Sequence, residues 1–139
     1  MKLIIAGSRT LRVKPELIVA LCELFNININ CIGSEIVCGG AGGIDASGEA
    51  FYRWYSLSPS SFLTFKKFPA DWGLYGKAAG PIRNEQMAEY ADALLLIWDG
   101  ASRGSASMKK EMEALGKPVY EVIFKSNLPV RCYGSDSLV

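Results

Sequence analysis

Five short apolar runs, separated by stretches of helical spacing, constrain the fold of this chain more than any other feature. The runs are LIIA (3–6), EIVCGG (35–40), FLTFKKFP (62–69), ALLLIW (93–98) and PVYEVIF (118–124). Short, nearly continuous apolar runs are typical of strands that are buried on both faces of a parallel sheet. Because the segments between them have apolar residues at helical spacing, the sequence predicts an α/β domain of three layers on a mostly parallel sheet of about five strands.

The helices are expected from Pro15 onward and over residues 44–55, 81–91 and 106–115. Glycine followed by proline favours a helix start, so Gly80 and Pro81 indicate the beginning of the third helix and residues 70–80 a long glycine-rich loop. We expect residues 1–124 to form a single domain. The polar residues 125–139 are then a C-terminal extension, either an edge strand or a frayed tail.

The sequence offers no segment for a membrane. The longest purely apolar run, residues 93–98, is far too short to span a bilayer. The N-terminus lacks the longer apolar region and the cleavage site of a signal peptide. We therefore expect a cytoplasmic protein, in the host cytoplasm if a phage encodes it. The four cysteines have no C-x-x-C spacing, and we interpret them as free thiols.

Histidine is absent from the chain, which removes Ser-His-Asp and Cys-His triads and the usual imidazole acid-base. Proton transfer would fall to a carboxylate, a lysine, a tyrosine or water. The net charge of +1 argues against a nucleic-acid partner held by bulk electrostatics. We predict no metal site and no required cofactor, and Mg²⁺ would enter only together with the phosphates of a ligand.

Residues typical of ligand sites follow the predicted strands, at the edge of a parallel sheet where ligands bind. They are Gly7, Ser8 and Arg9 after the first strand, Gly39, Gly40, Ala41, Gly42, Gly43 and Asp45 after the second, Asp71, Trp72, Lys77, Arg83 and Asn84 after the third, and Asp99, Gly100, Ser102, Gly104 and Ser105 after the fourth. Helix faces and strand beginnings carry nothing comparable. We expect these four loops to form one site.

Two of the loops have features of phosphate sites without matching a known phosphate motif. GGAGGID (39–45) lacks the Gly-Lys-Ser/Thr of a P-loop, and an aspartate replaces the third glycine of G-x-G-x-x-G. Its glycines either bring backbone N–H groups to a ligand or form a tight turn. DGASRGSAS (99–107) opens a helix whose first turn has no acid. This loop is either a second phosphate site or a helix start capped by Ser105 or Ser107.

The side chains around the third helix each have two interpretations. Arg83 either binds a phosphate or carboxylate or forms a salt bridge with Glu85, Glu89 or a neighbouring loop. Lys77 either adds a point charge or is a solvated surface lysine. Trp72 either stacks on a base or covers the core. Three aspartates are alternative acceptors for ribose hydroxyls, or caps of turns: Asp45, Asp71 and Asp99.

Four motifs, in order, resemble the SLOG superfamily, the Rossmann-like group that includes Smf/DprA and the LOG enzymes. They are AGSRT (6–10), VCGGAGGID (37–45), FPADWGLYGKAAGPIRNEQM (68–87) and LLLIWDGASRGS (94–105). The likeness is greatest to small YspA/YpsA-related members found in bacteria and phages, and it covers residues 3–124. It implies a Rossmann-like fold and a nucleotide-type ligand on the glycine loops.

LOG phosphoribohydrolases carry P-G-G-x-G-T-x-x-E, whose glutamate acts with an arginine at the glycosidic bond. In this chain Met108 stands at the position of that glutamate, and Glu111 lies one turn further along. Arg83 matches the family's arginine. The resemblance therefore implies a nucleotide ligand, while the departure at Met108 argues against LOG-like hydrolysis.

Three functions are compatible with this pattern. The first is binding of a nucleotide or nucleotide-derived small molecule, as a sensor or sequestering module, with phosphates at the two glycine loops and Arg83 and Arg9 beside them. The alternative is hydrolysis or transfer at an N-glycosidic bond, with Asp45, Asp71, Asp99 or Glu111 as acid-base or nucleophile. The third is binding of single-stranded DNA, which the near-neutral charge disfavours. The aromatic residues of the 44–55 segment further predict a homo-oligomer.

Overall fold

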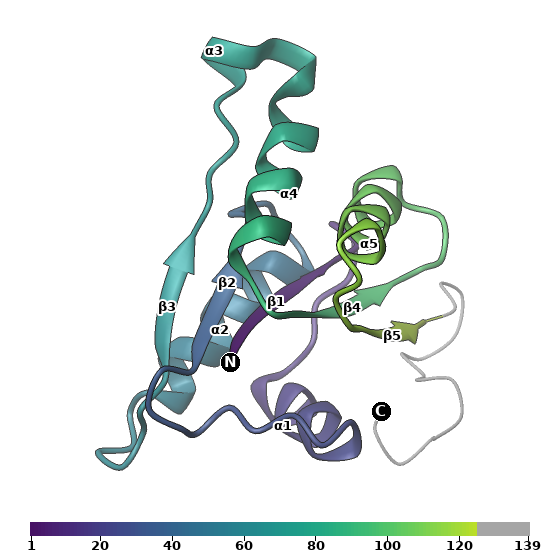
Figure 1. The fold of residues 1–139 in the computed structure, drawn as a ribbon. Coiled ribbons are helices and arrows are strands. Elements are labelled where there is room, and N and C mark those ends of the chain that lie inside the picture. Colours follow the sequence, from purple (N-terminus) through teal and green to yellow (C-terminus); the bar gives the residue numbers. More distant parts are fainter. Residues whose placement is uncertain (125–139) are drawn as a thin grey trace.

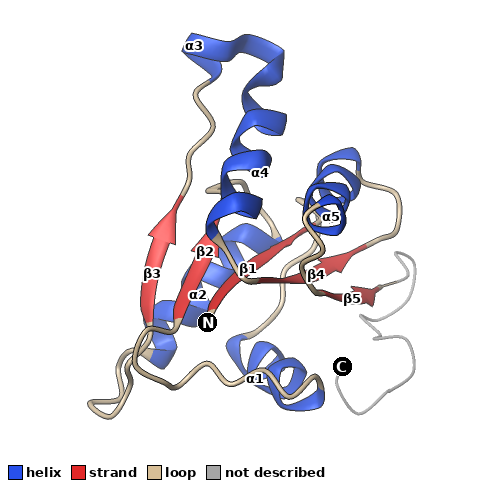
Figure 2. Ribbon diagram, viewed as in Figure 1, coloured by secondary structure: helices blue, strands red, loops and turns tan. Residues whose placement is uncertain are grey.

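Five strands form one sheet in the computed structural model, which describes residues 1–124 (Figures 1 and 2). The strands are β1 (Lys2–Gly7), β2 (Glu35–Cys38), β3 (Thr64–Lys67), β4 (Ala93–Trp98) and β5 (Val119–Ile123). All of their pairings are parallel, in the order β3-β2-β1-β4-β5. The prediction of a three-layer, Rossmann-like α/β domain is thereby confirmed. The predicted extension, residues 125–139, lies outside the described residues.

The sheet is covered on both faces because alternate residues of each central strand point in opposite directions. In β1, Leu3 and Ile5 are buried in the core under α1 (Pro15–Leu24) and α2 (Ile44–Tyr55). Ile4 and Ala6 of the same strand are buried in a second core under α4 (Ala79–Tyr90) and α5 (Arg103–Ala114). The two cores explain why the strands lack polar alternation.

The strand order changes direction at β1. From β1 the chain moves outward through β2 to β3, and it then crosses back to β4 on the other side of β1. The loops that follow β1 and β4 diverge at this point, one leading to α1 and the other to α5. In sheets of this kind, such a reversal leaves a crevice at the carboxyl ends of the two strands.

The segment before α4 differs from the prediction of a long loop. It contains a short helix, α3 (Trp72–Tyr75), and a 3-10 turn, η1 (Gly76–Ala78), which runs directly into α4. The carboxylate of Asp71 stabilises α3, since its Oδ1 accepts the N–H of Leu74 at 3.0 Å. Figure 1 shows α3 beyond the end of the sheet, where residues 71–78 are all exposed. The helix therefore starts before Pro81, and Arg83 lies in its second turn rather than its first.

The aromatic side chains of α2 lie mostly against the domain itself. Phe51 is buried and contacts the rings of Trp54 and Tyr55, and Tyr52 stacks on Phe65. Trp54 remains 44% exposed. Self-association through this helix stays a prediction.

Three of the four cysteines, Cys22, Cys31 and Cys38, are free thiols, as expected, and Cys132 lies outside the described residues. Within residues 1–124, no helix is both long and apolar enough to cross a membrane.

Candidate functional site

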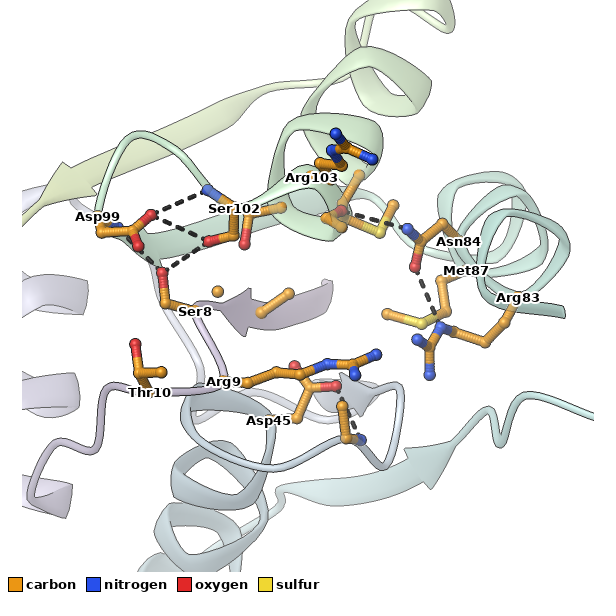
Figure 3. Close-up of a pocket in the computed structure, with 16 residues that line it drawn as sticks. Ser8, Arg9, Thr10, Asp45, Arg83, Asn84, Met87, Asp99, Ser102 and Arg103 are labelled. Carbon is orange, nitrogen blue, oxygen red and sulfur yellow. Dashed lines mark hydrogen bonds between the residues drawn. The ribbon is translucent and has the colours of Figure 1, made fainter. Parts of the chain in front are cut away.

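A cavity of about 300 Å³ opens at the carboxyl edge of the sheet, between the loops that follow β1 and β4 (Figure 3). The loop after β2 and the inner face of α4 complete its wall. Sequence analysis predicted most of the residues that line it, namely Gly7, Ser8, Arg9, Ala41, Asp45, Arg83, Asn84, Asp99, Ser102, Gly104 and Ser105. Residues of the loops after β1, β2 and β4 meet at this cavity, and the residues predicted after the third strand reach it through Arg83 and Asn84 of α4.

A polar cluster ties the loop after β4 to the loop after β1. Asp99 Oδ1 accepts the backbone N–H groups of Ala101 at 2.8 Å and Ser102 at 3.0 Å, and the Ser102 hydroxyl at 3.0 Å. The hydroxyl of Ser8 lies 2.9 Å from that of Ser102 and accepts the N–H of Asp99. These hydrogen bonds, foremost that from Ala101, lower the pKa of Asp99. Asp99 therefore holds the loop in shape as an ionised carboxylate.

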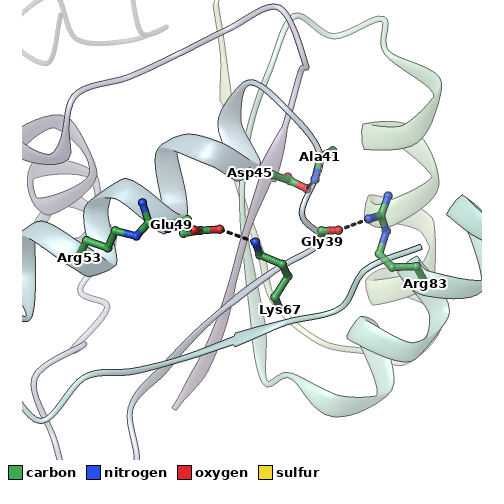
Figure 4. A network of polar contacts seen from close by, with 7 residues as sticks. All are labelled: Gly39, Ala41, Asp45, Glu49, Arg53, Lys67 and Arg83. Atoms are coloured by element: carbon green, nitrogen blue, oxygen red, sulfur yellow. Dashed lines mark hydrogen bonds and ion pairs between the residues drawn. The ribbon is translucent and has the colours of Figure 1, made fainter. Parts of the chain in front are cut away.

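The arginine of α4 connects two loops that are far apart in the sequence. Arg83 is 8% exposed, and its Nη1 donates to the carbonyl oxygen of Gly39 (Figure 4). Its Nε donates to Asn84 Oδ1 at 3.1 Å (Figure 3). A Cβ at Gly39 would lie 2.5 Å from Nη1, so this contact requires glycine there. The amide of Asn84 in turn donates to the carbonyl oxygen of Gly104 at 3.3 Å.

Arg83 carries its charge without a carboxylate partner. Both of its hydrogen-bond acceptors are neutral, and within residues 1–124 no carboxylate oxygen lies within 4.0 Å of its guanidinium. Burial lowers the pKa of Arg83, nearby Asp45 raises it, and the like charge of Arg9 lowers it again. Of the alternatives considered from the sequence, a salt bridge with Glu85 or Glu89 is not found within residues 1–124, and Arg83 instead contacts the loop after β2 through the carbonyl of Gly39. Two neighbouring guanidinium groups thus line the cavity without an ion pair, and Asp45 is near enough to interact with the charges of both.

Asp45, the second residue of α2, is the buried carboxyl group of the site. It is 7% exposed, and its Oδ2 accepts the N–H of Ala41 at 3.1 Å (Figure 4). This hydrogen bond closes the loop of residues 39–43 after β2, called the glycine loop below. Burial raises the pKa of Asp45, and the hydrogen bond from Ala41 and the charge of Arg83 oppose the rise. Asp45 is therefore the carboxyl group in the cavity whose protonation is made easier by its surroundings.

The N-terminus of α5 is left uncapped. Its N-cap residue is Ser102, whose hydroxyl is engaged with Asp99 and makes no capping hydrogen bond. Within residues 1–124, the N–H groups of Arg103, Gly104 and Ser105 find no acceptor. The first turn contains no acid. The buried hydroxyl of Ser105 also lacks a hydrogen-bond partner in this part of the chain. Neither Ser105 nor Ser107 provides the cap considered from the sequence.

A second cavity, of about 360 Å³, adjoins the first along the glycine loop. Arg9, Ala41 and Arg83 border both cavities. The remaining wall of the second consists of Gly39, Gly40, Gly42, Pro69, Ala70 and Trp72. Trp72, the first residue of α3, thus borders this second cavity.

Some of the candidate residues border neither cavity. Gly43 is buried where a Cβ would lie 2.3 Å from the carbonyl oxygen of Ser8, so its role is packing. Asp71 caps α3, and Lys77 and Gly100 are exposed. Glu111 lies away from the cavity, whereas Met108 lines it.

Sequence reasoning missed several lining residues, which are Ala6, Thr10, Met87, Arg103, Pro69 and Ala70. Met87 carried a usable signal, because it lies one helical turn after Arg83 and Asn84 and so shares their face.

The chain is 29% identical over 119 residues to the Gene 61 protein of Mycobacterium phage D29, a match that covers 85% of this chain and 93% of that protein. No protein-family model matches the sequence, and no solved structure matches it either.

Proposed function

We propose that this protein binds a nucleotide or nucleotide-derived small molecule at the carboxyl edge of the sheet, with a phosphate group at the N-terminus of α5. The observation that carries the proposal is the set of donors without acceptors at that terminus: three backbone N–H groups and the buried Ser105 hydroxyl. Arg103 and Gly104 are exposed, whereas the Ser105 hydroxyl is buried, and a buried donor without a partner is costly. An anion at the helix N-terminus satisfies this hydroxyl and the three N–H groups together while interacting favourably with the helix dipole.

The charges around the cavity support the same assignment. Arg9, Arg83 and Arg103 line it, and none of them has a carboxylate within ion-pair distance among residues 1–124. Of the two lining aspartates, Asp99 is engaged with its own loop. Arg103 and the donors without acceptors at the α5 terminus are therefore suited to the phosphate of a nucleotide. The resemblance to the SLOG superfamily suggests the same ligand class.

The test is a thermal-shift panel of nucleoside mono-, di- and triphosphates, ADP-ribose and inorganic phosphate, followed by calorimetry on the best ligand. A ligand at a hundred times its Kd adds about 2.7 kcal/mol to the folded state. Arg103→Ala should weaken binding at least tenfold, since hydrogen bonds to charged groups are worth roughly 1.5–3 kcal/mol. Lys110→Ala, an exposed cation on the same helix away from the cavity, should change it less than twofold. A panel without any shift contradicts the proposal.

A second candidate function is hydrolysis of an N-glycosidic bond, favoured by one observation. Asp45 is a buried carboxyl group with a raised pKa beside Arg83 in the same cavity. The Asp45 carboxylate, as general base, would take a proton from water. The water oxygen would bond to the anomeric carbon as the bond from that carbon to the nucleobase nitrogen breaks. The released nucleobase would then take up the proton from Asp45. Release of free base from a bound nucleotide, abolished by Asp45→Asn, would establish this activity. Binding without release limits the protein to recognition.

A further inference from the structure

The second cavity adjoins the proposed phosphate site and has a different character. It is bordered by the glycine loop, Pro69 and Trp72. Among residues 1–124, the only side-chain charges on its wall are the guanidinium groups of Arg9 and Arg83, which it shares with the first cavity. Each cavity alone is near the lower limit of small-molecule sites, which is roughly 300 Å³. A ligand that fills both must pass Arg9 and Arg83.

Trp72 presents an aromatic surface at this cavity. It is 54% exposed although it is one of the largest apolar side chains in the domain. One end of its indole lies against α4 at Gly80, where an added Cβ would be 3.5 Å from the ring. The Asp71 cap fixes the turn that carries it. An indole that is held at one end and open to solvent over much of its surface is suited to stacking on a planar aromatic group.

The glycine loop provides the other side of this cavity. Within residues 1–124, the N–H groups of Gly40 and Gly42 donate to no acceptor. Nothing lies within 4 Å of the position a Cβ would take at Gly42. Lys67 lies beside Gly40, but its ammonium group pairs with Glu49 at 2.9 Å (Figure 4). The loop therefore offers backbone donors and open space, and the charge on this side comes from the two arginines.

We infer that the ligand is an extended nucleotide, a nucleoside diphosphate or longer. Its base stacks on Trp72 in the second cavity, its phosphates pass between Arg9 and Arg83, and its terminal phosphate lies at the N-terminus of α5. This assignment rests on the proposed function, because it uses the same phosphate site. It adds an orientation, a minimum length and a role for Trp72 that the first cavity alone does not require.

Calorimetry with ADP, GDP, CDP, UDP, the matching monophosphates and inorganic pyrophosphate tests the inference on the whole chain. Trp72→Ala should weaken the best nucleoside diphosphate by 5- to 150-fold, which corresponds to the roughly 1–3 kcal/mol of base–aromatic stacking. The same variant should leave pyrophosphate binding within twofold. Trp72→Phe should restore most of the affinity. Trp54→Ala, which removes the exposed tryptophan of α2 outside both cavities, serves as the control and should change nothing. The diphosphate should bind at least tenfold more tightly than its monophosphate.

The outcomes separate this inference from the proposed function. If Trp72→Ala leaves nucleotide affinity unchanged, or weakens pyrophosphate equally, the base does not stack on Trp72 and the inference is wrong. The phosphate site still stands in that case if Arg103→Ala weakens pyrophosphate binding. If neither pyrophosphate nor any nucleotide binds the wild-type protein, the proposed function itself fails.

Discussion

Replacement of Gly104 by aspartate should make the protein more stable and at the same time unable to bind its ligand. Gly104 is the second residue of α5, and nothing lies within 4 Å of the position of an added Cβ. A side chain therefore fits without displacing a neighbour. An acid in the first turn of a helix contributes about 0.3–1 kcal/mol through the helix dipole. Removal of glycine from a helix adds a few tenths of a kcal/mol more.

The expected gain is about 0.5–1.5 kcal/mol, which raises the Tm of a domain of this size by roughly 2–5 °C. The carboxylate would occupy the proposed phosphate position and repel an anion, so nucleotide affinity should fall at least tenfold. Gly104→Asn is the matched control, because it has nearly the same shape without the charge. It should retain binding within a few-fold and gain less stability.

Scanning calorimetry of the free variants and titration with the best ligand from the nucleotide panel measure both effects. Undiminished nucleotide affinity in Gly104→Asp would refute the assignment of the anion to α5. A lower Tm in the absence of ligand would refute the argument that this helix end is an unsatisfied positive terminus. Equal loss of binding in Gly104→Asn would show that space rather than charge matters at Gly104.

The remaining predictions concern stability. The ammonium group of Lys117 donates to the carbonyl oxygens of Ala88, Glu89 and Ala91 at the end of α4, at 2.7, 3.1 and 2.7 Å. Lys117→Met should therefore lower the free energy of unfolding, measured by urea titration, by about 1–3 kcal/mol. A loss of stability no larger than that of Lys110→Met would contradict this. Asp45 has a raised pKa in the folded state, so its ionised form reduces stability above that pKa, and this cost disappears below its ordinary pKa of 3.8. Asp45→Asn should therefore be more stable than the wild type at pH 7, with a gain that shrinks as the pH falls toward 3.8; a gain independent of pH would rule out burial of the charge as its cause.

The sheet could be predicted from the sequence because its signal is local. Residues 93–98 are apolar at every position, and the structure buries them all in β4 between two layers of helices. The convergence of the loops followed from the same reasoning, since parallel strands place their carboxyl ends at one edge. Asp99 and Ser102 could be identified as candidate site residues because they directly follow the fourth predicted strand.

The segment before α4 could not be predicted, since WGLYGKAAG contains three glycines and has no helical periodicity. It is helical because Asp71 caps the first turn and because the alanines at 78 and 79 allow η1 to continue into α4. The sequence predicted a helix start at Pro81, which would place Arg83 in the first turn. That start was wrong, because α4 begins at Ala79 and Arg83 lies in its second turn.

The partner of Arg83 was equally inaccessible, because Gly39 lies 44 residues away and contributes only a backbone carbonyl. The glycine loop shows the same limit. Its pattern left open whether the glycines serve a ligand or form a tight turn. In the structure Gly43 packs against the backbone of Ser8, whereas Gly42 has open space beside it.

The most direct test of the central claim is a two-dimensional NMR titration of backbone amides with the best nucleoside diphosphate from the panel. The account predicts that the amide signals of Arg103, Gly104 and Ser105 shift most, because their N–H groups gain an acceptor that they lack within residues 1–124. The glycine-loop amides at Gly40 and Gly42 should follow. Saturable binding that leaves the three α5 signals in place would contradict the account.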